Sequence, residues 1–305
     1  MKKLVGIGID IGGTSIKYGL VNTSGDILWD STKPTLARTS RKEIVENIYE
    51  AVNETVQIAM KSKLHVASVG IGTPGIVKDK NIVLGAADNL TDWIDVPLGD
   101  LIREQVNLPT CVANDADMMA IGEFSKSGFM DETVLFLTLG TGIGGALIIK
   151  GKLFQGHYGM GGEFGMFPMV VNGQILNWED VASTSAMVKL YLNQCDKKIK
   201  DAVNGIYIAQ RYLENQPLAV HVVEKVTRYI ALGISGYVNA LNPSKIIIGG
   251  GISSAGDFFI DKIRKKLSEF ALRESLENVN IVRAKLGNKA GFVGAALYGL
   301  KQNNY

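Results

Sequence analysis

The chain has 305 residues, enough for two domains of ordinary size and a sizeable core. Hydrophobic residues make up 46% and charged residues 20%, a globular balance that excludes a disordered chain. The formal net charge of +2 indicates neither a nucleic acid nor a membrane surface as a partner, and no apolar run is long enough to span a bilayer.

The start of the chain and its cysteines bear on the compartment. Met1-Lys2-Lys3 leads straight into the first expected strand, with no room for a signal peptide. Cys111 and Cys195 lie far apart and imply no disulfide framework. We therefore expect reduced thiols and a cytoplasmic protein.

The first part of the chain has the pattern of a β-β-β-α-β unit. Its helix has Ser40 as a plausible N-cap and Glu43 at the capping-box position, followed by apolar residues at helical spacing. The predicted elements are strands over 3–10, 15–21 and 26–32, a helix over 40–61 and a strand over 65–72.

A second group of elements follows a segment over 81–95 that we expect to be irregular. A buried strand over 109–113 ends at Asn114-Asp115, and a helix begins near Asp117. A carboxylate between a buried strand and a helix is where α/β proteins place reacting groups. The other predicted element here is a helix over 97–105.

The second half repeats this plan, which is typical of an α/β fold with mixed sheets. A glycine-dense loop over 156–166 holds one carboxylate, Glu163. The predicted elements are strands over 133–139, 145–150, 245–248 and 279–284, and helices over 178–195, 201–214, 218–241, 256–271 and 290–300.

Two glycine turns follow buried strands, one in each half: Gly12-Gly13-Thr14 and the run over 139–145. Glycines let backbone N–H groups approach a ligand closely, and a row of such groups binds anions. Each turn leads into another strand, which argues against dinucleotide-binding and Walker loops, whose glycines open a helix. We predict two glycine hairpins facing one phosphate chain, the second through Gly140, Thr141, Gly142 and Gly144.

A nucleoside triphosphate also needs a carboxylate for magnesium and a place for its base. Asp10 ends the first strand beside the first turn and suits Mg²⁺, held through water. The run Gly249-Gly250-Gly251 leaves no side chains in the way of adenosine. Lys17 is a further candidate for the nucleotide, although a solvated strand face is the simpler interpretation. Glycines serving only tight turns are the alternative for each run taken singly.

Asp115 is the candidate general base, because phosphoryl transfer to a hydroxyl needs a proton acceptor near the nucleophile. Spacing alone leaves open that Asp115 caps the following helix instead. Glu163 and Glu179 are acceptors suited to sugar hydroxyls, with a surface carboxylate as the alternative. His157 and Cys111 are not placed together by any pattern, and no cysteine cluster has zinc spacing.

Six motifs occur in order: Asp10-Ile11-Gly12-Gly13-Thr14, Gly72-Thr73-Pro74-Gly75, Asn114-Asp115, the run over 139–145, Gly162-Glu163-Phe164-Gly165 and Gly249-Gly250-Gly251. With these motifs the chain resembles the ROK family of repressors, open reading frames and sugar kinases, from the first strand to the last helix. The resemblance implies an actin/hexokinase-like (ribonuclease H-like) α/β ATPase fold with two domains and a cleft between them. It also implies ATP, Mg²⁺, transfer of the γ-phosphate to a sugar hydroxyl, and a homodimer.

Site residues carry over at matching positions. Asp115 matches the family's catalytic base and Glu163 its sugar-binding glutamate, while Asn114, Asn89 and Glu179 match or resemble sugar-contacting residues. We expect an N-terminal domain over 1–115, a C-terminal domain over 116–289, and a last helix over 290–305 that packs back on the first domain.

Two departures from the family pattern concern zinc. Met166 stands where the family's Gly-Glu-Ile-Gly-His motif has a histidine, and residues 167–178 contain no cysteine. We therefore expect no zinc. A thioether leaves an apolar, adaptable wall, and the pattern is similar to kinases of β-glucosides, which are phosphorylated at O6.

Other substrates and another class of function stay open. Glucose, N-acetylmannosamine, fructose and allose are alternative acceptors, and loops near 31–39, 86–95 and 154–180 should decide among them. A sugar-sensing regulator without activity is the alternative class. The intact Asp10 and Asp115 argue against it, and a repressor's helix-turn-helix has no room before Asp10.

Overall fold

The computed structural model describes residues 3–85, 90–126, 132–254 and 256–304. It divides into two compact units. The first is formed by Met1–Phe129, Gln155–Gly161 and Lys285–Tyr305, and the second by Met130–Phe154 and Gly162–Ala284.

The first unit is built on a five-stranded sheet in the order β3-β2-β1-β4-β7. β1, β2 and β3 form an antiparallel meander, whereas β4 and β7 run parallel to β1. The strands are β1 (Leu4–Ile11), β2 (Ser15–Asn22), β3 (Ile27–Pro34), β4 (His65–Thr73) and β7 (Thr110–Asn114).

The sequence pattern of each strand matches its position in this sheet. β1 is central, and all its residues after Leu4 are buried, as expected for a strand covered on both faces. β3 is at the edge, and its residues alternate between half-buried and exposed. The strands predicted over 3–10, 15–21 and 26–32 are therefore present within two residues of the observed ends.

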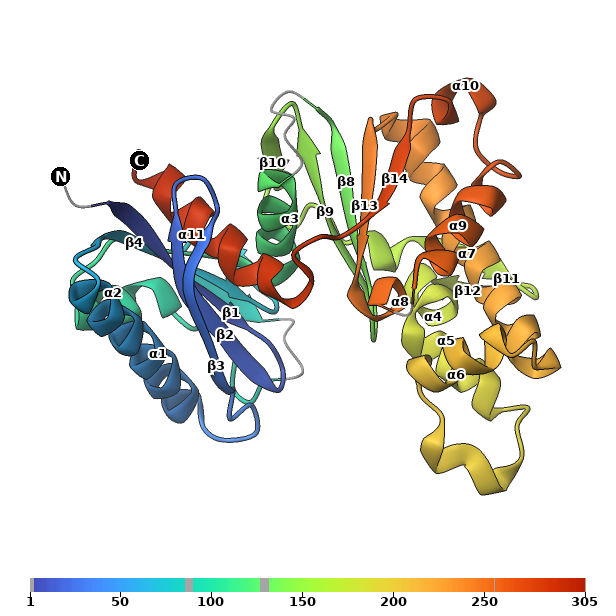
Figure 1. The fold of residues 1–305 in the computed structure, drawn as a ribbon, viewed down its shortest axis with the longest axis horizontal. Coiled ribbons are helices and arrows are strands. Elements are labelled where there is room, and N and C mark those ends of the chain that lie inside the picture. The colour runs from blue at the N-terminus through green and yellow to red at the C-terminus, as the bar shows by residue number, and fades with distance from the viewer. Residues whose placement is uncertain (1–2, 86–89, 127–131, 255, 305) are drawn as a thin grey trace. The chain divides into compact units, whose positions relative to one another are not determined.

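Helices cover both faces of the first sheet (Figure 1). α1 begins with the predicted capping box of Ser40 and Glu43, and its buried face packs on β1, β2 and β4. α11 packs on β1 and β4 from the other face and also contacts α3. The bounds are α1 (Arg41–Lys61), α2 (Leu98–Val106), α3 (Asp115–Ser125) and α11 (Ala290–Gln302).

The second unit repeats the strand order and the strand directions of the first. Its sheet runs β10-β9-β8-β13-β14, with β8, β9 and β10 antiparallel and with β13 and β14 parallel to β8. The strands are β8 (Val134–Leu139), β9 (Ile143–Ile149), β10 (Lys152–Phe154), β13 (Lys245–Gly249) and β14 (Asn280–Arg283).

Helices of the second unit form one apolar core with this sheet. Val226 and Ile230 of α7 lie in the same buried cluster as Leu137 of β8 and Ile248 of β13. The helices are α4 (Trp178–Ala182), α5 (Thr184–Leu192), α6 (Gly205–Leu213), α7 (Pro217–Leu241), α8 (Gly250–Ser254), α9 (Asp257–Leu267) and α10 (Arg273–Leu276), with short 3-10 turns η1 (Phe164–Met166), η2 (Lys197–Ala202) and η3 (Gly287–Lys289), the last in the first unit.

Two local predictions were wrong, and one hairpin was missed. The segment over 81–95 is not wholly irregular, because β6 (Ile82–Gly85) pairs with β5 (Ile76–Lys78). The helix predicted over 178–195 is two helices, since Ser183 ends α4 and its side chain caps α5. A hairpin of β11 (Pro168–Val171) and β12 (Gln174–Asn177) was not predicted.

The expected domain boundary after residue 115 stays a prediction. In the structure, α3 and α11 both belong to the first compact unit, so that unit extends beyond Asp115 and includes the end of the described chain. Among the described residues, no helix is long and apolar enough to cross a membrane.

Candidate active site

The first glycine turn joins β1 to β2 in the first unit. Gly12 N–H donates to Ser15 O at 3.0 Å, which closes the turn. Among the residues that the structure describes, the N–H groups of Gly13 and Thr14 have no hydrogen-bond acceptor, and the Thr14 side chain is exposed. The turn therefore offers two backbone donors to an anion.

Asp10 lies at the end of β1 and is only 8% exposed. Burial raises the pKa of its carboxyl group, and Lys17 Nζ, 3.5 Å from Asp10 Oδ2, acts in the opposite direction. A Cβ atom on Gly291 of α11 would lie 2.5 Å from Asp10 Cγ, so only glycine leaves room for this carboxylate. A buried carboxylate beside an anion-binding turn has the chemistry that a hard cation such as Mg²⁺ requires.

The register of the first sheet brings these groups to one edge. Asp10 pairs with Gly72 of β4, and Thr73 pairs with Asn114 of β7. The carboxyl ends of β1, β4 and β7 therefore present the first glycine turn and the Asn114-Asp115 pair on the same side of one sheet.

The structure resolves which residue caps α3. Asn114 is the N-cap, and its Oδ1 accepts from Ala116 N–H at 2.8 Å, while its Nδ2 donates to Gly75 O at 3.1 Å. Asp115 is the first residue of the helix, is half-buried, and accepts from Ala116 N–H at 2.9 Å. The capping role considered for Asp115 thus belongs to its neighbour.

Trp93 anchors the loop that precedes α2. It is 1% exposed and its Nε1 donates to Thr73 Oγ1 at 2.9 Å, which ties the loop to the same sheet edge. The predicted sugar ligand Asn89 lies outside the described residues.

The second glycine turn joins β8 to β9 and is shorter than predicted. Gly140 N–H donates to Gly142 O at 3.0 Å, and Gly144 already belongs to β9, opposite Thr138. The exposed Thr141 is the tip of the turn. Its N–H and that of Gly142 have no acceptor within the described part of the chain, as in the first turn.

Two residues outside this turn hold it in place. Thr184 N–H donates to Gly140 O at 2.8 Å, and Ile143 N–H donates to Glu179 Oε2 at 3.1 Å. Glu179 is therefore hydrogen-bonded to the end of the second glycine turn, a contact that was not predicted from the sequence.

The third glycine run is a strand-to-helix junction. Gly249 ends β13, and Gly250 and Gly251 begin α8, so this run is not an open turn followed by a later helix. Gly250 has φ +82°, and a Cβ atom there would lie 2.6 Å from Leu139 O. Only glycine allows α8 to begin this close to the end of β8.

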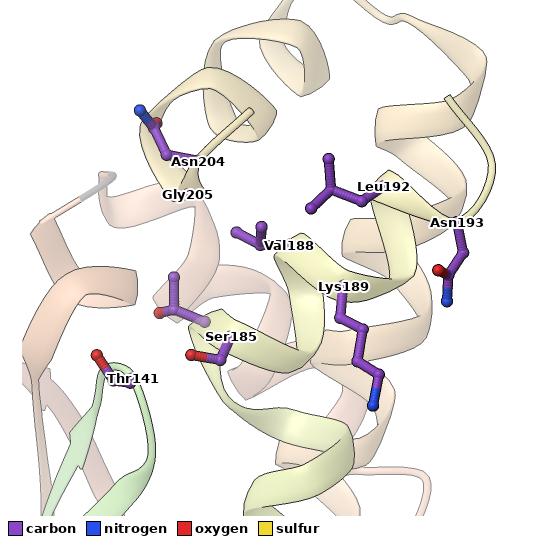
Figure 2. A pocket seen from close by; sticks show the side chains of 9 residues that line it. Thr141, Ser185, Val188, Lys189, Leu192, Asn193, Asn204 and Gly205 are labelled. Atoms are coloured by element: carbon purple, nitrogen blue, oxygen red, sulfur yellow. The ribbon is translucent and has the colours of Figure 1, made fainter. Parts of the chain in front are cut away.

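A cavity of about 420 Å³ opens beside Thr141 and the first turns of α5. Figure 2 shows Val188 and Leu192 on the side of α5 that faces Asn204. Thr184 also lines it, and among the described residues its buried Oγ1 has no hydrogen-bond partner. The lining is Thr141, Thr184, Ser185, Val188, Lys189, Leu192, Asn193, Asn204 and Gly205.

Glu163 and Met166 flank the 3-10 turn η1. The Glu163 side chain is exposed and has no hydrogen-bond partner among the described residues. Met166 is 46% exposed, and its sulfur lies 3.6 Å from Asn177 Nδ2. The two side chains thus belong to one accessible segment of the second unit.

Each unit gathers its own part of the predicted site. Asp10, Lys17 and Asp115 belong to the first unit, and Glu163 and Glu179 to the second. The cavity could not be predicted from the sequence, because its lining comes from three separate segments of the chain. Within the described ranges, no group of three or more His, Cys, Asp or Glu side chains is placed to hold a metal ion.

Comparison with known proteins gives matches over nearly the whole chain. The sequence profile of the ROK family matches residues 6–302. A glucokinase of Streptomyces coelicolor is 34% identical over 95% of this chain and 96% of its own. A β-glucoside kinase of Listeria innocua is 26% identical over 97% of both chains.

The structure of a ROK family glucokinase from Streptomyces griseus in complex with glucose and AMPPNP is also similar. It is 33% identical, with a TM-score of 0.81, over 97% of this chain and 99% of that chain. Both halves of the fold are therefore shared with that structure.

Proposed function

Because this chain belongs to the ROK family and is an ATP-dependent carbohydrate kinase with an actin/hexokinase-like fold, we propose that it phosphorylates O6 of a hexose or a β-glucoside. β-Glucosides are the first candidates. Glucose is the second, and the glucokinases of two Streptomyces species favour it.

The observation that carries the β-glucoside proposal is the position of Met166. It lies three residues after Glu163, is accessible, and accepts a hydrogen bond from Asn177 Nδ2 with its sulfur. If Glu163 binds the sugar, a flexible thioether beside it leaves an apolar wall that accepts a substituent on the anomeric oxygen. The name of the Listeria innocua relative supports this choice.

Asp115 is the proposed general base. It accepts the proton of the sugar hydroxyl as that oxygen attacks the γ-phosphorus of ATP and the bond to ADP breaks. Its place at the start of α3, on the sheet edge that carries the first glycine turn, supports this role.

Sugar hydroxyls are assigned to Asn89, Asn114, Glu163 and Glu179. The exposed Glu163 carboxylate is accessible to a ligand, whereas Glu179 already uses Oε2 on Ile143 N–H and has Oε1 left for a hydroxyl. Asn114 uses both ends of its amide on the chain, so its contact with a sugar would be an additional hydrogen bond.

The nucleotide is assigned to the glycine runs. The backbone N–H groups of Gly13, Thr14, Thr141 and Gly142 suit phosphate oxygens, and Gly12, Gly140 and Gly144 give the two turns their shape. Asp10 would hold Mg²⁺ through water, and the ion would neutralise phosphate charge. Lys17 adds a cation beside Asp10.

The cavity beside Thr141, together with the glycine run Gly249-Gly250-Gly251, is the proposed adenosine site. Val188 and Leu192 give it an apolar wall for a base, and Thr184 and Asn204 give it polar groups for the ribose or the ring nitrogens. A Cβ atom on Gly251 would lie 3.5 Å from Thr184 Oγ1, so Gly251 lies next to a residue that lines the cavity.

The proposal includes a homodimer without structural zinc. Size-exclusion chromatography with light scattering tests the dimer, and metal analysis of the purified protein tests for zinc. One zinc per chain would contradict the expectation based on Met166.

The function is tested by ADP release with Mg·ATP over a panel of glucose, N-acetylmannosamine, fructose, allose, cellobiose and an aryl β-glucoside. Preferred turnover of the two glucosides supports the proposal. Turnover of free glucose far above any β-glucoside keeps the kinase and rejects the Met166 argument. Binding of sugar with no turnover of any member would point to a sugar-sensing regulator.

A further inference from the structure

A fully buried threonine outside the proposed site is hydrogen-bonded to the first glycine turn. Thr35 follows β3 and has no exposed surface. Its Oγ1 donates to Gly12 O at 2.6 Å, and its N–H donates to Thr14 O at 3.1 Å. Two of the carbonyl groups of the turn are thereby held on the side of Thr35.

Holding the Gly12 carbonyl fixes the direction of the next N–H group. In a planar trans peptide, the C=O and the N–H point in opposite directions. Because Gly12 O is directed at Thr35 Oγ1, the Gly13 N–H points away from Thr35. That N–H has no acceptor among the described residues, so it is aimed outward and available to an anion.

A side chain of α1 is hydrogen-bonded to the peptide group that precedes Thr35. Asn47 of α1 is 6% exposed, and its Nδ2 donates to Pro34 O at 2.5 Å. The peptide between Pro34 and Thr35 is therefore bonded at both ends, to Asn47 through its carbonyl and to Thr14 through its N–H. This arrangement connects a well-packed helix to a turn that would otherwise be flexible.

We propose that Thr35 is a positioning residue for the phosphates of ATP. Its hydroxyl and N–H preorganise the first turn, so that Gly13 N–H already points at a phosphate oxygen when ATP binds. Two adjacent glycines have wide conformational freedom, and without Thr35 that freedom must be lost on binding. The inference rests on the proposed function. Thr35 lies in the loop near 31–39, which we expected to select the sugar, and the inference assigns it a role in nucleotide binding instead.

Thr35→Val removes the hydroxyl and keeps the shape of the side chain. We expect kcat/KM for ATP to fall by about tenfold or more, because Gly13 N–H is no longer preorganised and Gly12 O is left without its buried partner. The KM for the sugar should stay within about twofold, and Thr35→Ser should restore the ATP parameters.

Thr55→Val is the matched control. Thr55 is equally buried in the same unit, and its Oγ1 donates to a backbone carbonyl, Ala51 O, at 2.7 Å, but within α1. The Thr55→Val variant should lose about as much thermal stability as Thr35→Val and keep wild-type ATP parameters. If the wild-type protein turns over and Thr35→Val and Thr55→Val have equal ATP parameters, the role of Thr35 is overturned while the proposed kinase function stands.

Two further measurements keep the inference testable if the first variant or the proposed reaction fails. If Thr35→Val loses cooperative melting, Asn47→Ala decides: a smaller rise in the KM for ATP supports the inference, and no rise overturns it. If the wild-type protein phosphorylates no sugar, calorimetric titration with Mg·ATP replaces the kinetics, and equal affinity in wild type and Thr35→Val overturns it.

Discussion

The first residue of α3 illustrates how one side chain can be tested without disturbing its element. Asp115 accepts a hydrogen bond from Ala116 N–H at 2.9 Å. An asparagine keeps a carbonyl oxygen for that bond but cannot take up a proton. We expect Asp115→Asn to lower kcat by about 10²–10⁴-fold, the range of general base catalysis. Steady-state turnover and calorimetry with Mg·ATP measure the effect, and ATP affinity should be nearly unchanged. Retained turnover would remove Asp115 as the base.

The burial of the Asp10 carboxyl group makes the stability of the folded protein depend on pH. Burial raises its pKa above the ordinary value of 3.8, so the folded state holds the proton more tightly than the unfolded state. The stability contributed by this group is therefore fully present below pH 3.8 and is lost as the pH rises through the folded pKa. At pH 8 the buried charge destabilises the protein.

Asp10→Asn should consequently raise the melting temperature at pH 8, with a gain that shrinks toward pH 4, while turnover is lost. Differential scanning fluorimetry across this pH range measures the gain. Asp26→Asn is the control of opposite sign, because the hydrogen bond from Lys126 lowers the pKa of Asp26. A melting temperature of Asp10→Asn below that of wild type at pH 8 would contradict the argument.

At the scale of elements, α4 is linked to the second glycine turn through one carboxylate. Glu179 Oε2 accepts from Ile143 N–H, and Ile143 is only 5% exposed. Glu179→Ala leaves that buried N–H without an acceptor, at a cost of about 1–3 kcal/mol. We expect this variant to raise the KM for ATP as well as the KM for the sugar.

Glu179→Gln keeps an acceptor oxygen for the turn, so it should affect the sugar KM and leave the ATP KM close to wild type. Asp180→Ala is the matched control, since Asp180 also accepts from a backbone N–H, that of Asn177 at 3.0 Å, without touching the turn. An unchanged ATP KM in Glu179→Ala would show that the contact with Ile143 does not position the turn.

The sequence predicted elements well where the signal is local. The capping box at Ser40 and Glu43 lies within four residues and was confirmed. The β11–β12 hairpin had a usable signal in Asn172-Gly173, whose φ angles of 52° and 77° suit a tight hairpin turn. The β5–β6 hairpin had none, because its turn places Asp79 and Lys80 at positive φ without a glycine.

Hydrogen bonds between distant elements could not be predicted from the sequence. The hydrogen bond of Thr35 to Gly12 joins residues 23 apart, and that of Glu179 to Ile143 joins residues 36 apart. Patterns of hydrophobicity give the elements, whereas these bonds depend on how strands pair and where helices begin.

At the scale of the whole molecule, α11 completes a unit whose five-stranded sheet ends with Asn114, far earlier in the chain. Phe292, Val293 and Leu300 are at most 2% exposed. Burial of such side chains contributes about 1.5–3 kcal/mol each, so these three alone rival the roughly 5–15 kcal/mol of total stability in a domain. A chain that stops at Lys289 should therefore fail to fold its first unit.

Circular dichroism and limited proteolysis measure this loss, with a chain that stops at Gln302 as the control. The control keeps all of α11 and should melt like the full chain. Resistance of residues 4–125 to protease in the shorter chain would show that β1 and β4 do not need α11.

The division of the chain also sets the order in which its parts can mature during synthesis. The last segment of the first unit, Lys285–Tyr305, leaves the ribosome after the whole of the second unit. The second unit can therefore finish folding before the helix that packs over Gly8 of β1 and Gly70 of β4 has been translated. Domains usually mature from the N-terminus onward. Here the unit that begins first is completed last, and until then one face of its sheet lacks the helix that covers it.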